Sequence, residues 1–270
     1  MSRESVGRHR DDGKKGLLVV SFGTSYRETR EKTINAIERD LKRSFPDRAF
    51  FSGWTSRVLT AKVRKNEGAP VSTADEALKQ IEQAGIEDLL VQPTHLTDGI
   101  ENRRLREMLE KSSIRTIRLG RPLFSEKKDL MDVAKAIAWT FRRIGDDEAV
   151  ALMGHGSPGR KNHVYSELEK NFRSIGREDI FVATVEGDPG IQHIKEELSE
   201  RGPGRVWLAP LMLVAGDHAI NDLAGDDETS WRSEIEKAGY ETEPFLHGLG
   251  EFEEIRKIYI KHAMEAECIR

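Results

Sequence analysis

The stretch EAVALMGHG, residues 148–156, decides the fold. Its apolar run from Ala149 to Met153 carries no charge and stops at a glycine, so it predicts a strand that is buried on both faces. Similar uncharged runs recur along the chain and are separated by amphipathic segments of helical character. This alternation predicts an α/β protein in which helices flank parallel sheets.

The predicted strands and helices account for most of the chain. Strands are expected at residues 16–22, 48–54, 88–96, 114–120, 148–154, 179–185, 205–214 and 242–246. Helices are expected at about residues 26–45, as a pair within 56–84, from 101 onward, and at 126–143, 160–174, 191–201, 226–238 and 252–266.

The second half of this pattern echoes the first. The segment LLVQPTHLTDGIE (89–101) parallels VWLAPLMLVAGDH (206–218), so that Pro93 matches Pro210 and Glu101 matches His218. The alternative explanation is the composition that all α/β units share. We predict two similar Rossmann-like domains that face each other across a cleft.

The domain boundaries follow from this echo. We expect a flexible tail at residues 1–14, an N-terminal domain at 15–124 and a C-terminal domain at 125–270. The last helix could pack back on the first domain.

The composition excludes several classes of partner. The 270 residues carry a net charge of −4, which gives no general attraction for nucleic acid or an anionic membrane. The start of the chain has no apolar signal segment, and the lone Cys268 fits a reducing, cytoplasmic location. With one cysteine, any metal site must be built from His, Asp and Glu.

Three side chains that can bind a metal ion follow three predicted strands of the second half. His155, Glu186 and His218 lie at the carboxyl ends of these strands, where ligands bind in open parallel sheets. Two imidazoles and one carboxylate suit Co²⁺, Fe²⁺, Ni²⁺ or Zn²⁺ and leave coordination positions open. The same groups can accept protons. Taken singly, each also has a structural interpretation, as a helix cap or a first-turn carboxylate.

Five motifs carry a resemblance to a known family. They are LLVVSFGTS (17–25), VQPTHLTDGIE (91–101), MGHGS (153–157), TVEGDPG (184–190) and PLMLVAGDHAINDLAGDDETSW (210–231). Together they resemble the anaerobic, ATP-independent (class II) sirohydrochlorin cobaltochelatases of cobalamin biosynthesis, over about residues 15–266.

The resemblance implies a fold and an activity. It implies two α/β domains related by a pseudo-twofold axis, with the tetrapyrrole bound between them and His155, Glu186 and His218 handling the metal. The expected reaction is insertion of Co²⁺ into sirohydrochlorin without a nucleotide. Alternatives are insertion of Fe²⁺ or Ni²⁺ into the same macrocycle, a non-catalytic tetrapyrrole or metal carrier, and a hydrolase that uses Ser157 with His218.

Sirohydrochlorin carries carboxylates around its rim, so hydrogen-bond donors are expected to line the cleft. The expected partner is sirohydrochlorin or a related tetrapyrrole, with no nucleic acid or membrane and with a homo-oligomer as a possibility. His95 could be an accessory metal ligand, bind the tetrapyrrole or haem, or be a hydrogen-bonded turn residue. The predicted substrate-binding residues are Ser21, Phe22, Gly23, Thr24, Ser25, Arg57, His95, Glu101, Gly156 and Ser157.

Other polar residues are expected to have structural roles. Surface or packing positions are predicted for His9, His163, His193, His247 and His262. Loop solvation and helix capping are predicted for Asp217, Asp222, Asp226 and Asp227, because their irregular spacing lacks a calcium-loop pattern.

Overall fold

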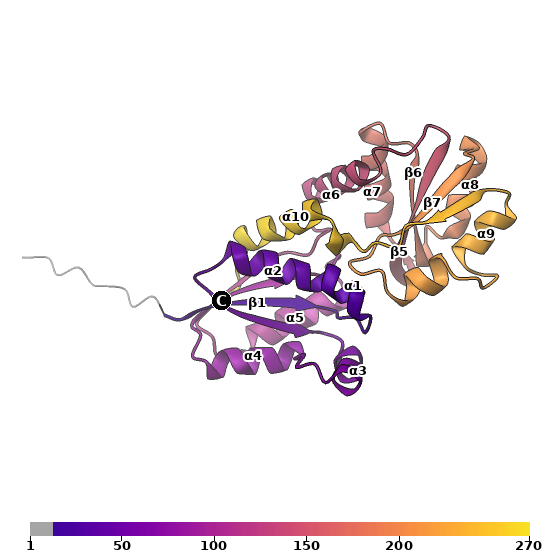
Figure 1. The fold of residues 1–270 in the computed structure, drawn as a ribbon. Helices are drawn as coiled ribbons and strands as arrows, with labels where there is room; N and C mark the ends of the chain where they lie inside the picture. The colour runs from indigo at the N-terminus through magenta and orange to yellow at the C-terminus, as the bar shows by residue number, and fades with distance from the viewer. Residues whose placement is uncertain (1–12) are drawn as a thin grey trace, which may run out of the picture.

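The structure is a computed structural model that describes residues 13–270, without the side chains of residues 158–161. Most of the predicted tail, including His9, therefore lies outside the described residues. Two separate sheets dominate the fold, as Figure 1 shows. The first has the order β2-β1-β3-β4-β9, and the second has the order β6-β5-β7-β8.

Most of the strands agree closely with those predicted from the sequence, but the short strand at residues 267–268 was not predicted. Those of the first sheet are β1 (Lys15–Ser21), β2 (Ala49–Trp54), β3 (Asp88–Pro93), β4 (Thr116–Leu119) and β9 (Glu267–Cys268). Those of the second are β5 (Glu148–Lys161), β6 (Ile180–Asp188), β7 (Arg205–Pro210) and β8 (Glu241–Pro244). Every pairing between these strands is parallel except that of β9 with β4.

The two sheets share one topology. In each, the first strand is central, the second lies on one side of it, and the third and fourth lie on the other side. This confirms the α/β fold of two similar parallel sheets. The arrangement creates a switch point between β1 and β3, and another between β5 and β7, and ligands of such sheets bind at the carboxyl ends beside these points.

Helices cover the sheets and connect the strands. They are α1 (Arg27–Lys32), α2 (Ile34–Ser44), α3 (Arg57–Glu67), α4 (Ala74–Gln83), α5 (Ile100–Glu110), α6 (Lys127–Thr140), α7 (His163–Ser174), α8 (Ile191–Arg201), α9 (Trp231–Lys237) and α10 (Glu253–Met264). A π-helix, η1 (Ala219–Leu223), and a 3₁₀ turn, η2 (Leu249–Glu251), were not predicted.

Several predicted boundaries are wrong for local reasons. The helix expected at 26–45 is divided at Thr33, whose hydroxyl donates a hydrogen bond to the carbonyl of Thr29 at 2.6 Å. The helix expected from residue 160 begins at His163, because β5 continues to Lys161. The strand expected to reach residue 214 ends at Pro210, because the carbonyls that follow it accept hydrogen bonds from the backbone of η2 instead.

One buried core joins the two sheets. Leu17 and Leu90 of the first sheet and Val150 of the second belong to the same buried cluster, together with side chains of α6, α7 and α10. The last helix, α10, packs against α2, α6 and β3, so the end of the chain lies on the first sheet (Figure 1). The hydroxyl of Tyr259 donates to the carbonyl of Thr94 at 2.8 Å across this contact. The boundary between residues 124 and 125 stays a prediction.

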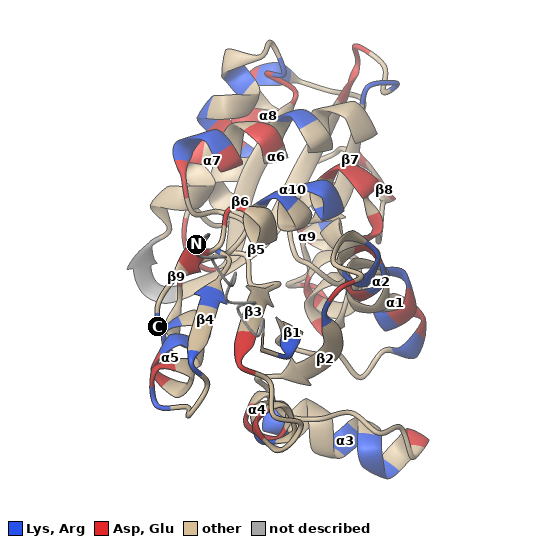
Figure 2. Cartoon of the chain, turned by 90° about the vertical axis from the view of Figure 1, so that its left-hand side faces the viewer, with Lys and Arg blue, Asp and Glu red and all other residues tan. Residues whose placement is uncertain are grey.

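The charged surface is mixed. Lys and Arg alternate with Asp and Glu along helices such as α7 in Figure 2. Within residues 13–270, no helix combines the length and apolar character that crossing a membrane requires.

Candidate metal site

The structure brings the three predicted metal-binding side chains together at the carboxyl ends of β5, β6 and β7. His155 lies in β5, Glu186 in β6, and His218 immediately before η1. His155 Nε2 lies 3.9 Å from Glu186 Oε2, and the rings of His155 and His218 meet edge to face with centroids 4.7 Å apart. All three side chains are partly exposed, with His155 the most exposed at 53%. A solvated ion can therefore reach them.

The two glycines that flank His155 are explained by close packing. A Cβ atom at Gly154 would lie 2.3 Å from Cε1 of Tyr165 on α7. At Gly156 the φ angle is +78°, and a Cβ atom would lie 2.0 Å from the carbonyl oxygen of Glu186. Only glycine avoids both the left-handed strain and this contact. The histidine is thus presented on a backbone that approaches its neighbours more closely than side chains would allow.

The backbone of Glu186 is fixed by polar side chains. The Asn162 amide donates to the Glu186 carbonyl at 3.0 Å and to the Thr184 hydroxyl at 3.2 Å. The Thr184 hydroxyl itself lies 3.0 Å from the same carbonyl. Since Asn162 and Thr184 are both buried, they hold this end of β6 in place while the carboxylate stays partly exposed.

The surroundings of His155 lower the pKa of its imidazole. Burial lowers the pKa of the His155 imidazole, and the nearby His218 lowers it further, while Glu186 and Asp222 oppose both effects. A neutral imidazole is the form that binds metal ions. His155 therefore retains its ligand form below the pH at which a free histidine would protonate.

Two acidic residues around His218 were predicted to be solvated loop residues, and their contacts in the structure are more specific. His218 Nδ1 lies 2.6 Å from Asp222 Oδ2. Asp217 accepts hydrogen bonds from the Tyr26 hydroxyl at 3.0 Å and from the Asn221 amide at 3.1 Å. Because Tyr26 follows β1, this contact joins the carboxyl ends of the two sheets.

The contact of His218 with Asp222 could have been predicted from their spacing of four residues, but this spacing brings two side chains together only in a helix.

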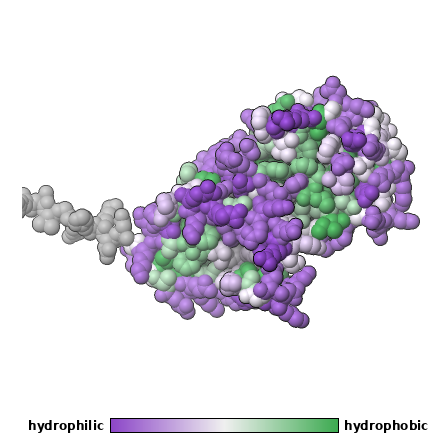
Figure 3. All heavy atoms as spheres, viewed as in Figure 1, coloured by the Kyte–Doolittle hydropathy of each residue, from purple (hydrophilic) through white to green (hydrophobic). Residues whose placement is uncertain are grey.

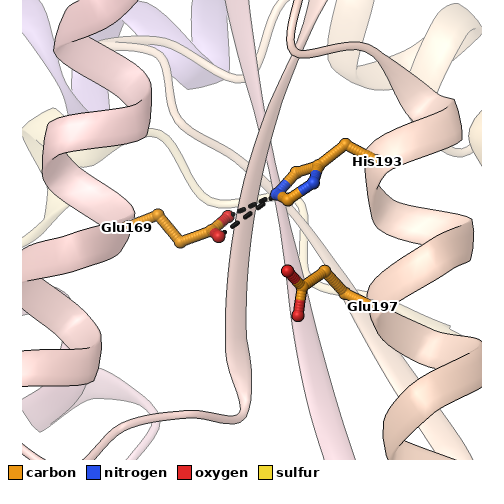
Figure 4. Close-up of side chains that lie close together, drawn as sticks. All are labelled: Glu169, His193 and Glu197. Carbon is orange, nitrogen blue, oxygen red and sulfur yellow. Dashed lines mark hydrogen bonds and ion pairs between the residues drawn. The ribbon is translucent and has the colours of Figure 1, made fainter.

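A second group of potential ligands lies away from this site, between α7 and α8 (Figure 4). The ligand atoms of Glu169, His193 and Glu197 all lie within 4.8 Å of one another. Those of the predicted triad, His155, Glu186 and His218, are not all this close together. However, Arg173 donates to Glu169 at 3.0 Å and to Glu197 at 2.6 Å, so a cation already bridges the carboxylates. We interpret this group as an ion-pair network, in line with the packing position predicted for His193.

The predicted substrate-binding residues of the first half differ in accessibility. Ser21 is fully buried and its hydroxyl accepts a hydrogen bond from Thr94, and the buried Thr24 hydroxyl accepts one from the backbone of Tyr26. Gly23 lies against the Trp54 ring, where a Cβ atom would come to 2.5 Å. Phe22 is 51% exposed. Ser25 is half-buried, and Ser157, in the second half, is exposed.

Three charged or titratable residues of the first half were also predicted to line the cleft. Arg57 is exposed and pairs with Asp75 at 3.5 Å, and Glu101 pairs with Arg104 at 3.4 Å. The ring nitrogens of His95 are buried and have no hydrogen-bond partner among the described residues. Burial lowers the pKa of His95, against smaller opposing effects of Asn102 and Glu101.

A cavity in the first half does not contain the triad. It measures about 240 Å³ and lies beside β4 and α5, with Asn102, Arg106 and Glu265 among its lining residues. The cleft between the halves therefore stays a prediction. Its position is supported by the contact of Tyr26 with Asp217 and by a hydrogen bond of 3.3 Å from the Thr29 hydroxyl to the carbonyl of Ala215.

Comparison with known proteins gives consistent matches over nearly the whole chain. The cobalt chelatase (CbiK) family matches residues 15–267. A sirohydrochlorin cobaltochelatase of Salmonella typhimurium is 38% identical over 255 residues, covering 94% of this chain and 96% of that protein. The sirohydrochlorin cobaltochelatase CbiKC of Nitratidesulfovibrio vulgaris is 30% identical over 261 residues, covering 94% and 90%.

A solved structure shares the fold. SirB from Bacillus subtilis with Fe³⁺ has a TM-score of 0.64 to this chain at 12% sequence identity and covers 93% of this chain and 95% of its own. At this identity the likeness concerns the arrangement of the two sheets alone.

Proposed function

The chain belongs to the cobalt chelatase (CbiK) family, and from this premise we propose that it inserts Co²⁺ into sirohydrochlorin with His155, Glu186 and His218 as the metal-handling residues. The observation that carries the residue assignment is the convergence of these side chains. They come from β5, β6 and the segment after β7, which are remote in sequence, yet the imidazole of His155 lies 3.9 Å from the carboxylate and its ring centroid 4.7 Å from that of His218.

The reaction exchanges two pyrrole N–H protons for one divalent ion. Its barrier comes from removing water from the ion, bending the macrocycle and removing the protons. The two histidines hold the ion partly dehydrated and oriented before it meets the ring, which lowers the entropic part of the barrier. Glu186 accepts the two pyrrole protons one after the other and releases each to solvent, since its carboxylate is partly exposed.

The surroundings of the site suit a flat apolar ligand with a polar rim. Phe22, Ile100 and Ile220 are large apolar side chains that remain 40–55% exposed, and each follows the carboxyl end of a strand, β1, β3 or β7. Hydrophilic residues predominate on the side shown in Figure 3, where hydrophobic residues also gather in several stretches. Exposed apolar side chains at the ligand edge of both sheets are what the faces of a tetrapyrrole would cover. Arg57 and Ser25 are proposed to bind its carboxylates.

The metal and the cellular context belong to the same proposal. Co²⁺ is the ion that the family name and the relatives indicate. Fe²⁺ and Ni²⁺ fit the same two-histidine, one-carboxylate set, because affinity for such sites changes gradually along the first transition row. The proposal further includes a cytoplasmic location and a reaction that needs no nucleotide. It also includes a homo-oligomer and two domains, at residues 15–124 and 125–270.

The test is metal insertion by substituted proteins. The variants are His155→Ala, Glu186→Gln and His218→Ala, followed by the change in visible absorbance when sirohydrochlorin takes up Co²⁺. Each should lose at least about tenfold in turnover. His247→Ala is the matched control, because this exposed histidine also pairs with a carboxylate, Glu251, four residues away. Near wild-type turnover in all three site variants would refute the assignment.

A further inference from the structure

We propose that Asp222 is a positioning residue that fixes the orientation and tautomer of His218, so that His218 Nε2 is presented to the incoming Co²⁺. This inference rests on the proposed function. It concerns a residue whose sequence context indicated only loop solvation or helix capping.

The distance between the two side chains defines which nitrogen binds the ion. Asp222 Oδ2 lies 2.6 Å from His218 Nδ1. An ionised carboxylate can only accept a hydrogen bond, so Nδ1 carries the proton and donates it. In the neutral imidazole the other nitrogen, Nε2, then holds a free lone pair. The pairing thus selects the tautomer in which Nε2 is free to bind a metal ion.

The local backbone makes this pairing possible. His218 immediately precedes the π-helix Ala219–Leu223, and Asp222 lies four residues later within that helix. A π-helix is rare and is found disproportionately at functional sites. Here its turn places the carboxylate beside the imidazole. Asp217 does not compete for His218, because it accepts hydrogen bonds from Tyr26 and Asn221.

The two histidines of the site are held differently. Among the described side chains, the nearest charged partner of His155 is Glu186 at 3.9 Å, which is beyond hydrogen-bond distance. His218 is held by a short, charge-assisted hydrogen bond. A carboxylate that accepts from a ligating histidine orients the ring and increases its basicity. His218 is therefore the more firmly oriented of the two histidines.

The experiment measures binding of Co²⁺ alone, without tetrapyrrole. The full-length protein is titrated with Co²⁺, and binding is read from the visible d–d absorption of the bound ion. Asp222→Ala should weaken binding by about 10- to 100-fold, the range found when such carboxylate partners are removed. Asp222→Asn should weaken it by about three- to tenfold, since the amide oxygen still accepts the hydrogen bond but without a charge.

Matched controls separate positioning from stability. Asp226→Asn removes a nearby carboxylate that is 97% exposed and pairs with Arg232, so it should bind Co²⁺ like the wild type. The double variant His218→Ala/Asp222→Ala should bind no more weakly than His218→Ala, because Asp222 acts through His218. In turnover, the substitutions at Asp222 should raise the KM for Co²⁺ and leave the KM for sirohydrochlorin unchanged.

The outcomes distinguish this inference from the proposed function. If His218→Ala loses Co²⁺ but Asp222→Asn binds as tightly as the wild type, the inference is wrong and the proposed function stands. If His155→Ala and His218→Ala insert Co²⁺ at wild-type rates, the assignment of the metal-handling residues is wrong. If the wild-type protein does not insert Co²⁺ into sirohydrochlorin, the proposed function itself is wrong. Should Asp222→Ala fail to fold, as judged by thermal unfolding, the Asn variant decides.

Discussion

Gly156 lies directly opposite Glu186 in the parallel pairing of β5 with β6, and a Cβ atom at Gly156 would come within 2.0 Å of the Glu186 carbonyl oxygen. The residue after one proposed metal ligand is therefore in backbone contact with another. Any side chain at Gly156 must move β5 away from β6, and this changes the separation of the His155 imidazole from the Glu186 carboxylate.

Gly156→Ala should therefore reduce both activity and stability. We expect a loss of about 3 kcal/mol in the free energy of unfolding, because left-handed backbone strain and a backbone clash act together. Gly176→Ala is the control: its φ is +77°, but nothing lies within 4 Å of the added Cβ atom. It should lose only about 1–2 kcal/mol and keep full turnover. Urea unfolding and Co²⁺ insertion measure the two effects, and equal losses in both variants would contradict the clash.

A buried carboxylate on α6, which faces α10, should contribute strongly to stability. Asp129 and His262 are both fully buried, with Asp129 Oδ1 3.1 Å from His262 Nε2, and Arg121 Nε lies 3.0 Å from Asp129 Oδ2. Burial raises the pKa of Asp129, but Arg121 and His262 outweigh it and lower the pKa below its usual value. Asp129→Asn should cost about 3 kcal/mol, because it leaves the Arg121 guanidinium, which is only 20% exposed, without this buried counter-charge.

The same two helices provide the control for this prediction. Asp132 on α6 pairs with Lys261 on α10 at 3.0 Å, but both side chains are more than a third exposed. Asp132→Asn should therefore cost less than about 1 kcal/mol. Comparable urea midpoints for the two variants would show that burial does not determine the contribution of the pair.

The sequence predicts the parts of this molecule that depend on local pattern. Uncharged apolar runs identify β1, β3, β5, β6 and β7, because strands covered on both faces exclude charge. The triad was predictable because its members follow such strands, whose carboxyl ends lie at one edge of a sheet. Both inferences use only sequence position and the geometry of parallel sheets.

The remaining features depend on register and on unusual backbone. The contact of Gly156 with Glu186 requires the pairing of β5 and β6, which no local signal specifies. The hydrogen bond from His218 to Asp222 requires a helical turn at 218–222, which a segment flanked by Gly216 and Gly225 does not suggest. The extension of β5 to Lys161 runs through serine, proline and glycine, residues that ordinarily indicate a turn.

Substitution of Phe22 should weaken tetrapyrrole binding. Phe22 is 51% exposed after β1, on the ligand edge of the first sheet. Phe22→Ser should raise the KM for sirohydrochlorin by about tenfold, because burying an aromatic side chain contributes roughly 1.5–3 kcal/mol, of which a partial contact captures about half. Met264→Ser removes another exposed apolar side chain, 65% exposed at the end of α10, and should leave the KM unchanged. An equal KM in both variants would exclude Phe22 from the binding surface.

The network between α7 and α8 should make stability depend on pH. The hydrogen bond of His193 to Glu169 raises the pKa of the imidazole, and burial opposes this to a lesser extent. A pKa that is higher in the folded than in the unfolded state means that the protonated form stabilises the fold. This contribution is complete below the unfolded value of about 6.5 and is lost as the pH rises through the higher folded value. His193→Gln should therefore reduce the free energy of unfolding more at pH 5.5 than at pH 9. Urea unfolding of both proteins at the two pH values measures the difference, and a loss that is equal at both would mean that His193 stabilises the contact by packing alone.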